Sequence, residues 1–340
     1  MSTTPFLLPI TQLAGGRAEL VPHEVIKELS VVSTARGVAL VLFQYLAIAV
    51  VIAVCESHFS WWTYPISVVL IGSRLLAMVS LVHDGVHWRL ARHKGFNDFL
   101  NEMLLCFPLV ESAERNRVYH LAHHRHFKTG RDPERERFLG QEESRFSRDF
   151  RGYPKSLGAV TWMVFRNVSG LAFFEMFYEL KRVSTRENKL EFTPKYSRLK
   201  LAGYLSLAVI FSAYGLWLEF FLYYFVPVCT WAKLCLQLRA LSNHFGMEET
   251  ANPYSGTRTL IASYVEQMLV CPYFVGHHLD HHLYPSVPCY RLGALHRELL
   301  KHPEYRNNAH LTRGIWALLM ELAGRGDPRT DTTLRFEAEL

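Results

Sequence analysis

The chain has few cysteines, and their placement excludes the usual cysteine-based sites. Its six cysteines are scattered, mostly through apolar segments, and no CxxC pair occurs. We therefore expect neither a disulfide framework nor a cysteine zinc site. The apolar stretch near the N-terminus is short and no basic segment precedes it, so we do not expect a signal peptide.

Charge is nearly absent from several long stretches, and this decides the class of protein. Residues 37–55 carry no charge and would form a helix of about 28 Å, close to the roughly 30 Å core of a bilayer. Residues 61–82 are interrupted only by Arg74, and residues 201–232 only by Glu219. Four helices buried in a globular protein are the alternative, which such long uncharged runs disfavour. We expect transmembrane helices at about 37–57, 62–82, 199–217 and 220–240.

The basic residues indicate how these helices are oriented. The chain has 37 lysines and arginines against 31 acidic residues, and residues 88–200 are dense in them, whereas the loops near 56–60 and 218–219 have none. Basic loops remain on the cytoplasmic side of a membrane. We therefore expect a multi-pass integral membrane protein with both termini and both large polar regions in the cytoplasm.

The predicted fold is an all-α polytopic membrane protein with a single domain over residues 1–340. Residues 83–198 and 241–340 would form a helical cytoplasmic cap. Two shorter apolar segments, 99–113 and 157–178, contain charged residues, so we expect interfacial or re-entrant helices there. The polar stretch 127–155 is expected to connect elements of the cap.

Histidine is abundant, and eleven of the 17 histidines fall in four patches, HDGVH, HLAHHRH, SNHFG and HHLDHH. Positions i, i+3 and i+4 share one face of a helix, so three of these patches would present compact imidazole groups. The eleven residues are His83, His87, His120, His123, His124, His126, His244, His277, His278, His281 and His282. The others are expected to be ordinary surface or core residues, namely His23, His58, His93, His296, His302 and His310.

So many imidazoles exceed what one metal ion binds, and two ions are the natural number. Imidazole binds Fe, Zn, Cu and Ni, so the ligand type alone does not choose the metal. A histidine-lined metal transporter is one alternative to an enzyme. A transporter would place its ligands within the membrane spans, near the midplane, whereas these patches follow the expected spans.

The order and spacing of the patches resemble the membrane fatty-acid desaturase and hydroxylase superfamily. The resemblance runs from about Arg74 to Leu300 and includes Asn97-Asp98, Asp132-Pro133 and the stretch HHLYPSVP, which is similar to bacterial-type desaturases. It implies a di-iron site and favours a bacterial inner membrane over the endoplasmic reticulum. The implied iron ligands are His83, His87, His120, His123, His124, His244, His278, His281 and His282. His126 and His277 fall outside the pattern and are expected beside the site.

The resemblance implies an O2-dependent oxidoreductase that introduces a double bond into an alkyl or fatty-acyl chain. The chemistry agrees. A methylene group has no polar atom on which acid–base catalysis could act, so its C–H bond must be broken by an oxidant activated on a redox metal. Iron is such a metal, whereas zinc has no redox chemistry. A hydroxylase or ketolase of a lipid or carotenoid remains an alternative, since the same patches serve all these outcomes. The substrate class stays open, from acyl lipids, acyl-CoA and acyl carrier protein to a smaller amino-acid-like chain.

Electrons must come from another protein. The chain has no HPGG segment of a fused cytochrome b5, no CxxCH and no GxGxxG after a strand. We expect a separate carrier, either a ferredoxin, a rubredoxin, a flavoprotein or a cytochrome b5, and no nucleic-acid partner. The basic cytoplasmic face would steer an acidic carrier to the enzyme, or would contact lipid headgroups.

Three polar residues are candidates to support the metal ligands, namely Asp280, Asp84 and Asn243. Asp280 is expected to accept an N–H from a ligand imidazole, with a plain helix-surface acid as the alternative. The prolines in the stretch 284–288 are expected to end the helix after the last histidine pair.

Arg74 lies nine residues before His83, about 13 Å along a helix and inside the second span. An arginine within a membrane costs at least ~2.5–3.5 kcal/mol unless it has a partner. We favour a structural pair with a hydroxyl, a carbonyl or Glu219 over direct contact with substrate in the cavity.

Overall fold

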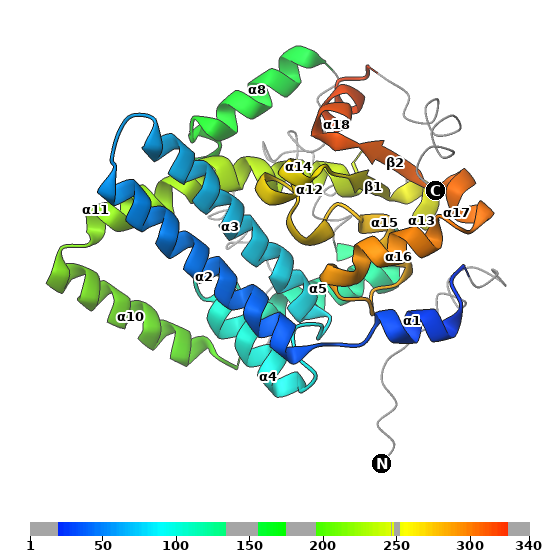
Figure 1. Cartoon of the computed structure of the whole chain (residues 1–340), viewed down its shortest axis with the longest axis horizontal. Coiled ribbons are helices and arrows are strands. Elements are labelled where there is room, and N and C mark those ends of the chain that lie inside the picture. Colours follow the sequence, from blue (N-terminus) through cyan, green and yellow to red (C-terminus); the bar gives the residue numbers. More distant parts are fainter. Residues whose placement is uncertain (1–19, 134–155, 175–194, 246, 248–251, 326–340) are drawn as a thin grey trace.

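The computed structural model describes residues 20–133, 156–174, 195–245, 247 and 252–325, and these are mostly helical (Figure 1). The first half contains α1 (His23–Leu29), α2 (Thr34–Ser57), α3 (Thr63–Val86), α4 (Lys94–Phe99), the π-helix η2 (Leu100–Cys106), α5 (Ala113–His126) and α8 (Leu157–Val168). Next come α10 (Ser197–Tyr214), α11 (Trp217–Phe220), the π-helices η3 (Phe221–Phe225) and η4 (Val228–Ala232), and α12 (Lys233–Asn243).

The C-terminal region is built from short elements. These are α13 (Pro253–Gly256), β1 (Arg258–Ile261), α14 (Tyr264–Leu269), η5 (Pro272–Phe274), α15 (His278–Leu283), η6 (Cys289–Arg291), α16 (Leu292–Leu299), α17 (Pro303–Asn308), β2 (His310–Arg313) and α18 (Gly314–Leu322). The prediction of an all-α membrane protein is confirmed. One small exception is the parallel pairing of β1 with β2, which the sequence did not indicate.

Three helices in the described part are long and apolar enough to cross a membrane, namely Thr34–Ser57, Thr63–Val86 and Trp217–Asn243. The fourth expected span, 199–217, folds as the 18-residue helix α10 and is not among these three. Gly215 adopts a left-handed conformation with φ 69° and ends α10 at Tyr214. The break therefore precedes the expected one at 218–219, and Glu219 lies inside α11.

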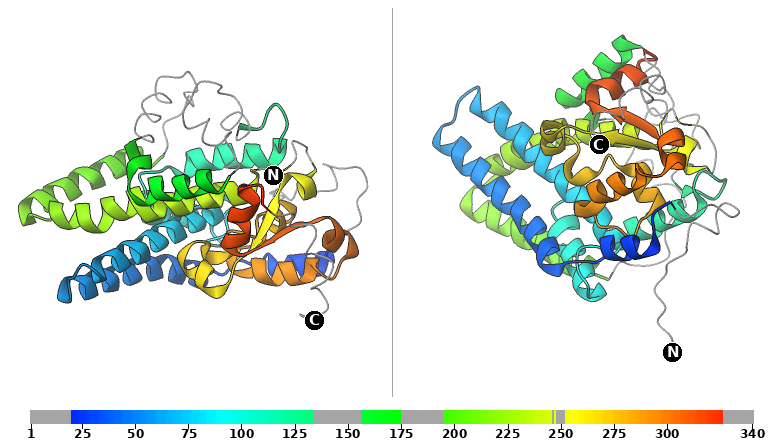
Figure 2. Two further views of the ribbon diagram at one scale, coloured as in Figure 1. Left: turned by 90° about the horizontal axis from the view of Figure 1, so that it is seen from above. Right: turned by 45° about the vertical axis from the view of Figure 1, so that its right-hand side comes forward.

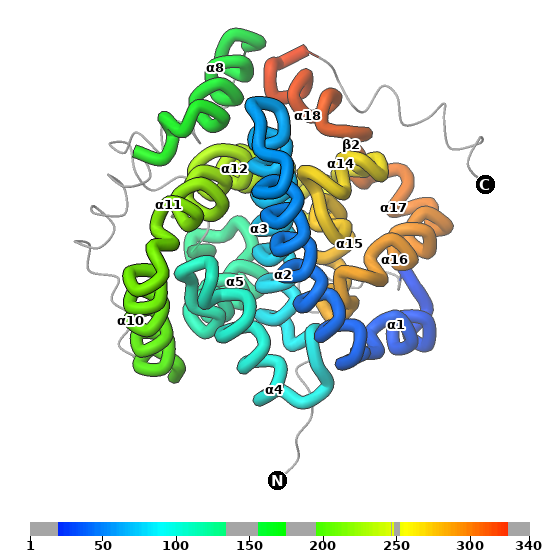
Figure 3. Tube along the Cα trace, turned by 60° about the vertical axis from the view of Figure 1, so that its left-hand side comes forward, coloured from blue at the N-terminus to red at the C-terminus, as the bar shows by residue number. Residues whose placement is uncertain are grey.

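α2 and α3 form an antiparallel pair that leads into the rest of the protein (Figure 1). Trp61 and Trp62 at the turn between them are 90% and 82% exposed, as expected for aromatic residues at a membrane–water interface. The last turns of α3 are buried, between α5 on one side and the segment around α15 on the other (Figure 3). The long helices project to one side, and the short C-terminal elements gather at the opposite end (Figure 2, left).

The two shorter apolar segments differ from each other. In the first, the polar residues Asn101 and Glu102 are buried in η2, where Asn101 donates to the Val82 carbonyl at 3.2 Å and Glu102 pairs with Lys200 at 2.7 Å. In the second, α8 buries Met163 on one face and exposes apolar residues such as Trp162 on the other. Residues 175–178 of that segment, and residues 134–155 of the expected connecting region, lie outside the described residues.

The two-stranded sheet brings distant parts of the C-terminal region together. Arg258 in β1 is 1% exposed and pairs with Glu321 of α18 at 3.0 Å. β1 also packs against α15 and α12. The sheet thus fixes α15, which carries three of the histidines, against the end of a long helix.

Candidate metal centre

Nine histidines converge where α3, α5, α12 and α15 meet. Their nitrogen atoms form two groups, and within each group all lie within 4.8 Å of one another. The first group consists of His83, His87, His120, His124 and His281. The second consists of His123, His244, His278 and His282. The structure thus brings together all nine residues that the sequence singled out as metal ligands.

Local helix geometry explains how each histidine reaches the centre. His83 lies in the last turn of α3, and His87 and His244 are the residues that cap α3 and α12. α5 and α15 each carry three histidines on one face. α15 ends at Leu283, just before Tyr284-Pro285, as expected from the two prolines.

Several Nε2 atoms of different histidines lie within 3.2 Å of one another. Nε2 of His124 lies 3.0 Å from the Nε2 atoms of both His120 and His281. Nε2 of His278 lies 2.9 Å from His244 and 3.2 Å from His282. Two imidazole nitrogens that bind one ion at about 2.1 Å lie roughly 3 Å apart, so this spacing fits a metal.

Two further Nε2 atoms have no hydrogen-bond partner, namely those of His83 and His87. Both atoms are buried, and an unsatisfied buried polar atom costs about 1–3 kcal/mol. A neutral imidazole has one N–H, so hydrogen bonds within the group cannot satisfy every nitrogen. A cation in each group would satisfy all of them, and this is the observation that makes the residues fit a metal.

The electrostatics of the groups favour the neutral imidazole. Burial, with a smaller contribution from the neighbouring imidazoles, lowers the pKa of His124, His278, His281 and His282 well below 6.5. Neutral imidazole is the form that binds a metal. The site is therefore ready to accept ions near neutral pH without first losing protons.

Groups behind the histidines fix the orientation of their rings. Asp132 is 1% exposed, and both its oxygens lie 3.0 Å from Nδ1 of His123. The Lys128 amide donates to the same carboxylate at 2.7 Å. Nδ1 of His244 lies 3.1 Å from the carbonyl of Gly256. Such partners hold Nε2 toward the centre. Asp132 was not predicted to support the site. The one feature of the sequence that marks this residue is the Asp-Pro pair after the second histidine patch.

The Asn-Asp pair after the first patch holds the end of α3. Asn97 donates to the Gly85 carbonyl at 2.9 Å, and Arg117 of α5 donates to the same carbonyl at 3.0 Å. Arg117 also pairs with Asp98 at 2.6 Å. These bonds join α3 to α5, which places His87 beside the histidines of α5.

Comparison with known proteins agrees with this geometry. Residues 59–313 match the family model described as fatty acid desaturase. The chain belongs to the fatty acid desaturase family. The dihydrorhizobitoxine desaturase of Bradyrhizobium elkanii is 25% identical over 281 residues, which cover 81% of this chain and 78% of that protein. The resemblance seen in the sequence is confirmed, and the protein is an oxidoreductase of the desaturase type. All nine histidines lie within the matched range.

Asp280 has other partners in this desaturase-family protein than expected. It is fully buried and accepts hydrogen bonds from Nδ1 of His277 at 3.0 Å, Nδ1 of His296 at 2.9 Å and the hydroxyl of Tyr305. Burial alone would raise the pKa of its carboxyl, but the charge of His296 and the bond from His277 lower it overall. Asp280 thus holds α15 against α16 and α17, and the described structure shows no hydrogen bond from it to the nine histidines.

The positions of His277 and His296 agree with the predictions. His277 lies beside the site, where it lines the cavity together with His278 and His281. His296 is a buried core residue that is hydrogen-bonded to Asp280 at 2.9 Å. The role of Tyr305 was missed, since nothing in its sequence neighbourhood marks it. His126 belongs to neither histidine group, and its carbonyl accepts from the Thr129 amide at 2.9 Å.

Asp84 and Asn243 lie next to ligand histidines in the chain but bond elsewhere. Asp84 accepts from the amide of Cys289 at 2.9 Å and so ties α3 to the chain after α15. Asn243 accepts from the hydroxyl of Ser242 at 3.4 Å. In the part of the chain that the structure describes, neither side chain hydrogen-bonds the imidazole of one of the nine histidines.

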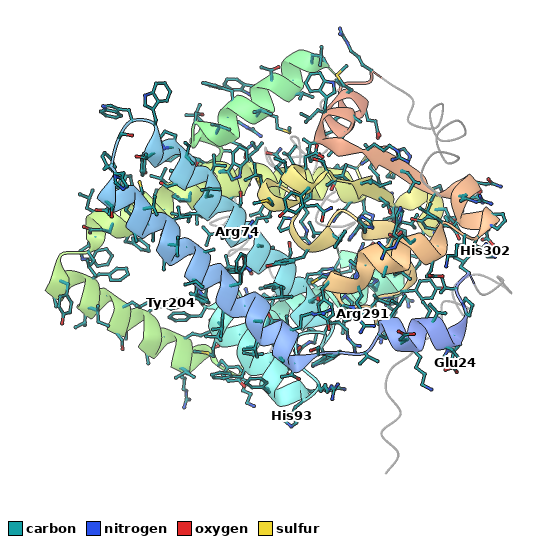
Figure 4. The ribbon with its side chains drawn as sticks, viewed as in Figure 1. Glu24, Arg74, His93, Tyr204, Arg291 and His302 are labelled. Atoms are coloured by element: carbon teal, nitrogen blue, oxygen red, sulfur yellow. The ribbon has the colours of Figure 1, made fainter. Side chains whose placement is uncertain are left out.

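Arg74 lies near the middle of α3 (Figure 4). Its guanidinium donates to the backbone carbonyl of Met268 in α14. The expected partner of an intramembrane arginine is therefore present and is a carbonyl, but it comes from the C-terminal region rather than from a neighbouring span.

A small cavity adjoins the metal centre. Its walls combine ligand imidazoles with polar and apolar side chains. They are formed by Ser80, His83, Asp84, Arg239, Tyr273, Val275, His277, His278, His281, Cys289 and Leu292. With a volume of about 10 Å³, the cavity is no larger than a water molecule requires.

Proposed function

We propose that the protein is an O2-dependent di-iron oxidoreductase that introduces a double bond into an alkyl or fatty-acyl chain, with electrons from a separate carrier protein. The single observation that carries this proposal is the pair of histidine groups with converging, buried Nε2 atoms. Membership of the desaturase family supports it. The position of the groups at the ends of apolar helices supports a substrate whose chain lies in the membrane.

The two groups would hold one iron ion each, the first through five imidazoles and the second through four. Iron suits imidazole ligands and, when bound, supplies the activation of O2 that an unactivated C–H bond requires. The described residues offer no carboxylate inside either group. The nearest buried acid by contact is Asp132, which would compensate part of the ions' charge through His123.

The chain's own residues would limit the access of water to the metal centre and fix the orientation of its ligand rings. His123, His278 and His281 are each at most 5% exposed, which limits the contact of these three ligands with bulk water. Asp132 would hold the ring of His123 in one orientation, and the Gly256 carbonyl would do the same for His244. Tyr273 and Leu292 line the small cavity beside the centre, together with the proposed ligands His83 and His281.

A metal transporter is disfavoured by where the ligands lie. His83 is in the last turn of α3, and His87 and His244 are at the ends of their helices. A transport site would lie near the bilayer midplane instead. We therefore keep the enzyme as the proposed function and place its histidines at the cytoplasmic end of the spans.

The outer face of α5 is suited to the electron carrier. α5 carries His120, His123 and His124 on its inner face, and Arg115 and Arg125 are exposed on it. Only the thickness of one helix would then separate a docked carrier from the metal centre. Exposed arginines favour an acidic carrier by electrostatic steering, which weakens as salt rises.

Product analysis tests the proposal. The protein is expressed in membranes together with a ferredoxin–reductase system and supplied with acyl substrates and with dihydrorhizobitoxine, the compound after which the relative is named. Mass spectrometry should show a product two hydrogen atoms lighter, formed only with O2 and lost in His281→Ala. A product heavier by one oxygen atom would instead identify a hydroxylase, and an unchanged substrate pool with iron present would count against both.

A further inference from the structure

The segment between β1 and α15, residues 262–276, contains α14 and η5. Its sequence, ASYVEQMLVCPYFVG, has one charged residue, Glu266. The sequence placed it in the cytoplasmic cap. Its contacts indicate a position at the level of the membrane helices, because side chains from the middle of these helices hydrogen-bond to its backbone.

The first set of contacts comes from α3 and η4. Ser73 donates to the Leu269 carbonyl at 2.8 Å, and Arg74 donates to the carbonyl of Met268. The indole of Trp231 also donates to the Leu269 carbonyl, at 3.3 Å. Ser73 lies ten residues before His83, which is about 15 Å along the helix axis. The end of α14 therefore lies well below the level of the histidines, toward the far end of the spans.

The second contact comes from α2. Gln44 is fully buried and donates to the hydroxyl of Tyr273 in η5 at 2.5 Å. Gln44 lies ten residues into α2, again about 15 Å from the end of that helix. Non-helical backbone at membrane depth occurs only where protein satisfies its polar groups. Ser73, Arg74 and Trp231 meet this requirement for two carbonyls at the end of α14, those of Met268 and Leu269.

The opposite face of the segment is apolar and uncovered by the described residues. Tyr264, Val265 and Met268 are 78%, 62% and 46% exposed. Glu266 is turned inward, where its carboxylate accepts from the amides of Ser263 at 2.7 Å and Ile315 at 2.6 Å. The one charge of the segment is thus paired with backbone amides, and the large side chains exposed on the outer face are those of Tyr264, Val265 and Met268.

We propose that residues 262–275 dip into the bilayer as a re-entrant segment and that Tyr264, Val265 and Met268 contact lipid acyl chains. The occupant of this face is lipid because the segment packs on α2 and α3 at the level where those helices expose their own apolar side chains. Leu46 of α2, for example, is 65% exposed. On this proposal the exposed apolar side chains of α14 extend the lipid-facing surface of α2 and α3.

The segment connects this lipid-facing surface with the metal centre. Its outer face begins at Tyr264, and its inner end, Tyr273, lines the cavity that also contains His83 and His281. The segment then forms one wall of the route by which an alkyl chain passes from the bilayer to the histidines. This last step rests on the proposed function, whereas the membrane placement does not.

Spin labelling in lipid nanodiscs tests the membrane placement without any turnover. Val265→Cys and Met268→Cys variants are labelled with a nitroxide, and collision with lipid-soluble O2 is compared with collision with a water-soluble nickel chelate. Leu46→Cys in α2 is the control for lipid exposure, and Lys301→Cys, on an exposed side chain of the cap, is the control for water. The six native cysteines are all buried, so they should label slowly, and unsubstituted protein gives the background.

Both α14 positions should match the α2 control, with an O2-to-nickel collision ratio at least about tenfold above that at position 301. A ratio at both α14 positions equal to that of Lys301→Cys would show that the segment lies in water and would overturn the proposal. Iron content and elution volume of each variant confirm that it is folded. Because the readout is independent of activity, failure of the proposed reaction would leave this result unaffected.

Discussion

At the scale of single residues, the two buried aspartates have different roles. Asp132 hydrogen-bonds His123 directly, whereas the hydrogen bonds of the Asp280 carboxylate to described side chains are with His277, His296, Thr259 and Tyr305. The sequence marked Asp280 because it stands among four histidines, and it passed over Asp132. Adjacency in the chain is a poor guide here, because on the short helix α15 Asp280 points away from the face that carries the proposed ligands.

Asp132→Asn should lower iron affinity by roughly 10–100-fold while leaving thermal stability nearly unchanged. The amide keeps the volume of the side chain but loses the charge that orients and polarises His123. Iron retained after dialysis against a graded chelator series measures the affinity, and Glu24→Gln, at an exposed acid, is the matched control. Equal retention by Asp132→Asn and the control would contradict the role given to Asp132.

Asp280→Leu should instead unfold the C-terminal region, with iron lost only as a consequence. Removal of this carboxylate leaves the donors of His277, His296 and Tyr305 buried without an acceptor, at about 1–3 kcal/mol for each unsatisfied group. The melting temperature of the detergent-solubilised protein should fall by several degrees. A variant with unchanged melting temperature and selective iron loss would show that Asp280 acts on the ligands directly, as the sequence suggested.

At the scale of elements, the sequence predicts the long helices and misses the contacts that join them. Uncharged runs identify α2, α3 and the helix from Trp217 to Asn243, because burial in lipid demands apolar side chains over that whole length. The strands β1 and β2 were not predicted. They lie far apart in the sequence, each is four residues long, and only their pairing makes them strands. η2 was hard to interpret because its buried Glu102 depends on Lys200, which is distant in the sequence.

The attachment of α18 to the sheet should depend on pH through Glu321. Burial alone would raise the pKa of this carboxyl, but the hydrogen bond from His310 and the charge of Arg258 bring it below the ordinary 4.5. A carboxyl with a lowered folded-state pKa adds stability that is complete above about pH 4.5 and is lost as the pH falls through the folded-state value.

Glu321→Gln should therefore destabilise the protein by about 3 kcal/mol at neutral pH, because Arg258 is left buried without its anion. The difference in melting temperature from the wild type should shrink as the pH falls below 4.5. Glu298→Gln, at the exposed pair with Lys301, is the control and should have almost no effect. A difference that stays constant from pH 7 to pH 4 would argue against the ion pair as the cause.

At the scale of the whole molecule, the nine histidines were found from the sequence and their division into two groups was not. Helical spacing shows that His120, His123 and His124 share a face, but only the tertiary structure shows that His123 turns to one group and the other two turn to the other. The membrane level of residues 262–275 was likewise hidden. It depends on Ser73 and Gln44, polar residues within apolar helices whose partners lie about 200 residues away.

The central claim is that the two histidine groups form a two-metal iron site, and the metal content of the purified protein tests it most directly. Elemental analysis of the wild-type protein, purified from membranes without added metal, should give about two iron atoms per chain and little zinc. His281→Ala and His278→Ala, one from each group, should each lose close to one iron atom or more. Zinc in place of iron, or less than about half an iron atom per chain in folded protein supplied with iron, would contradict the account.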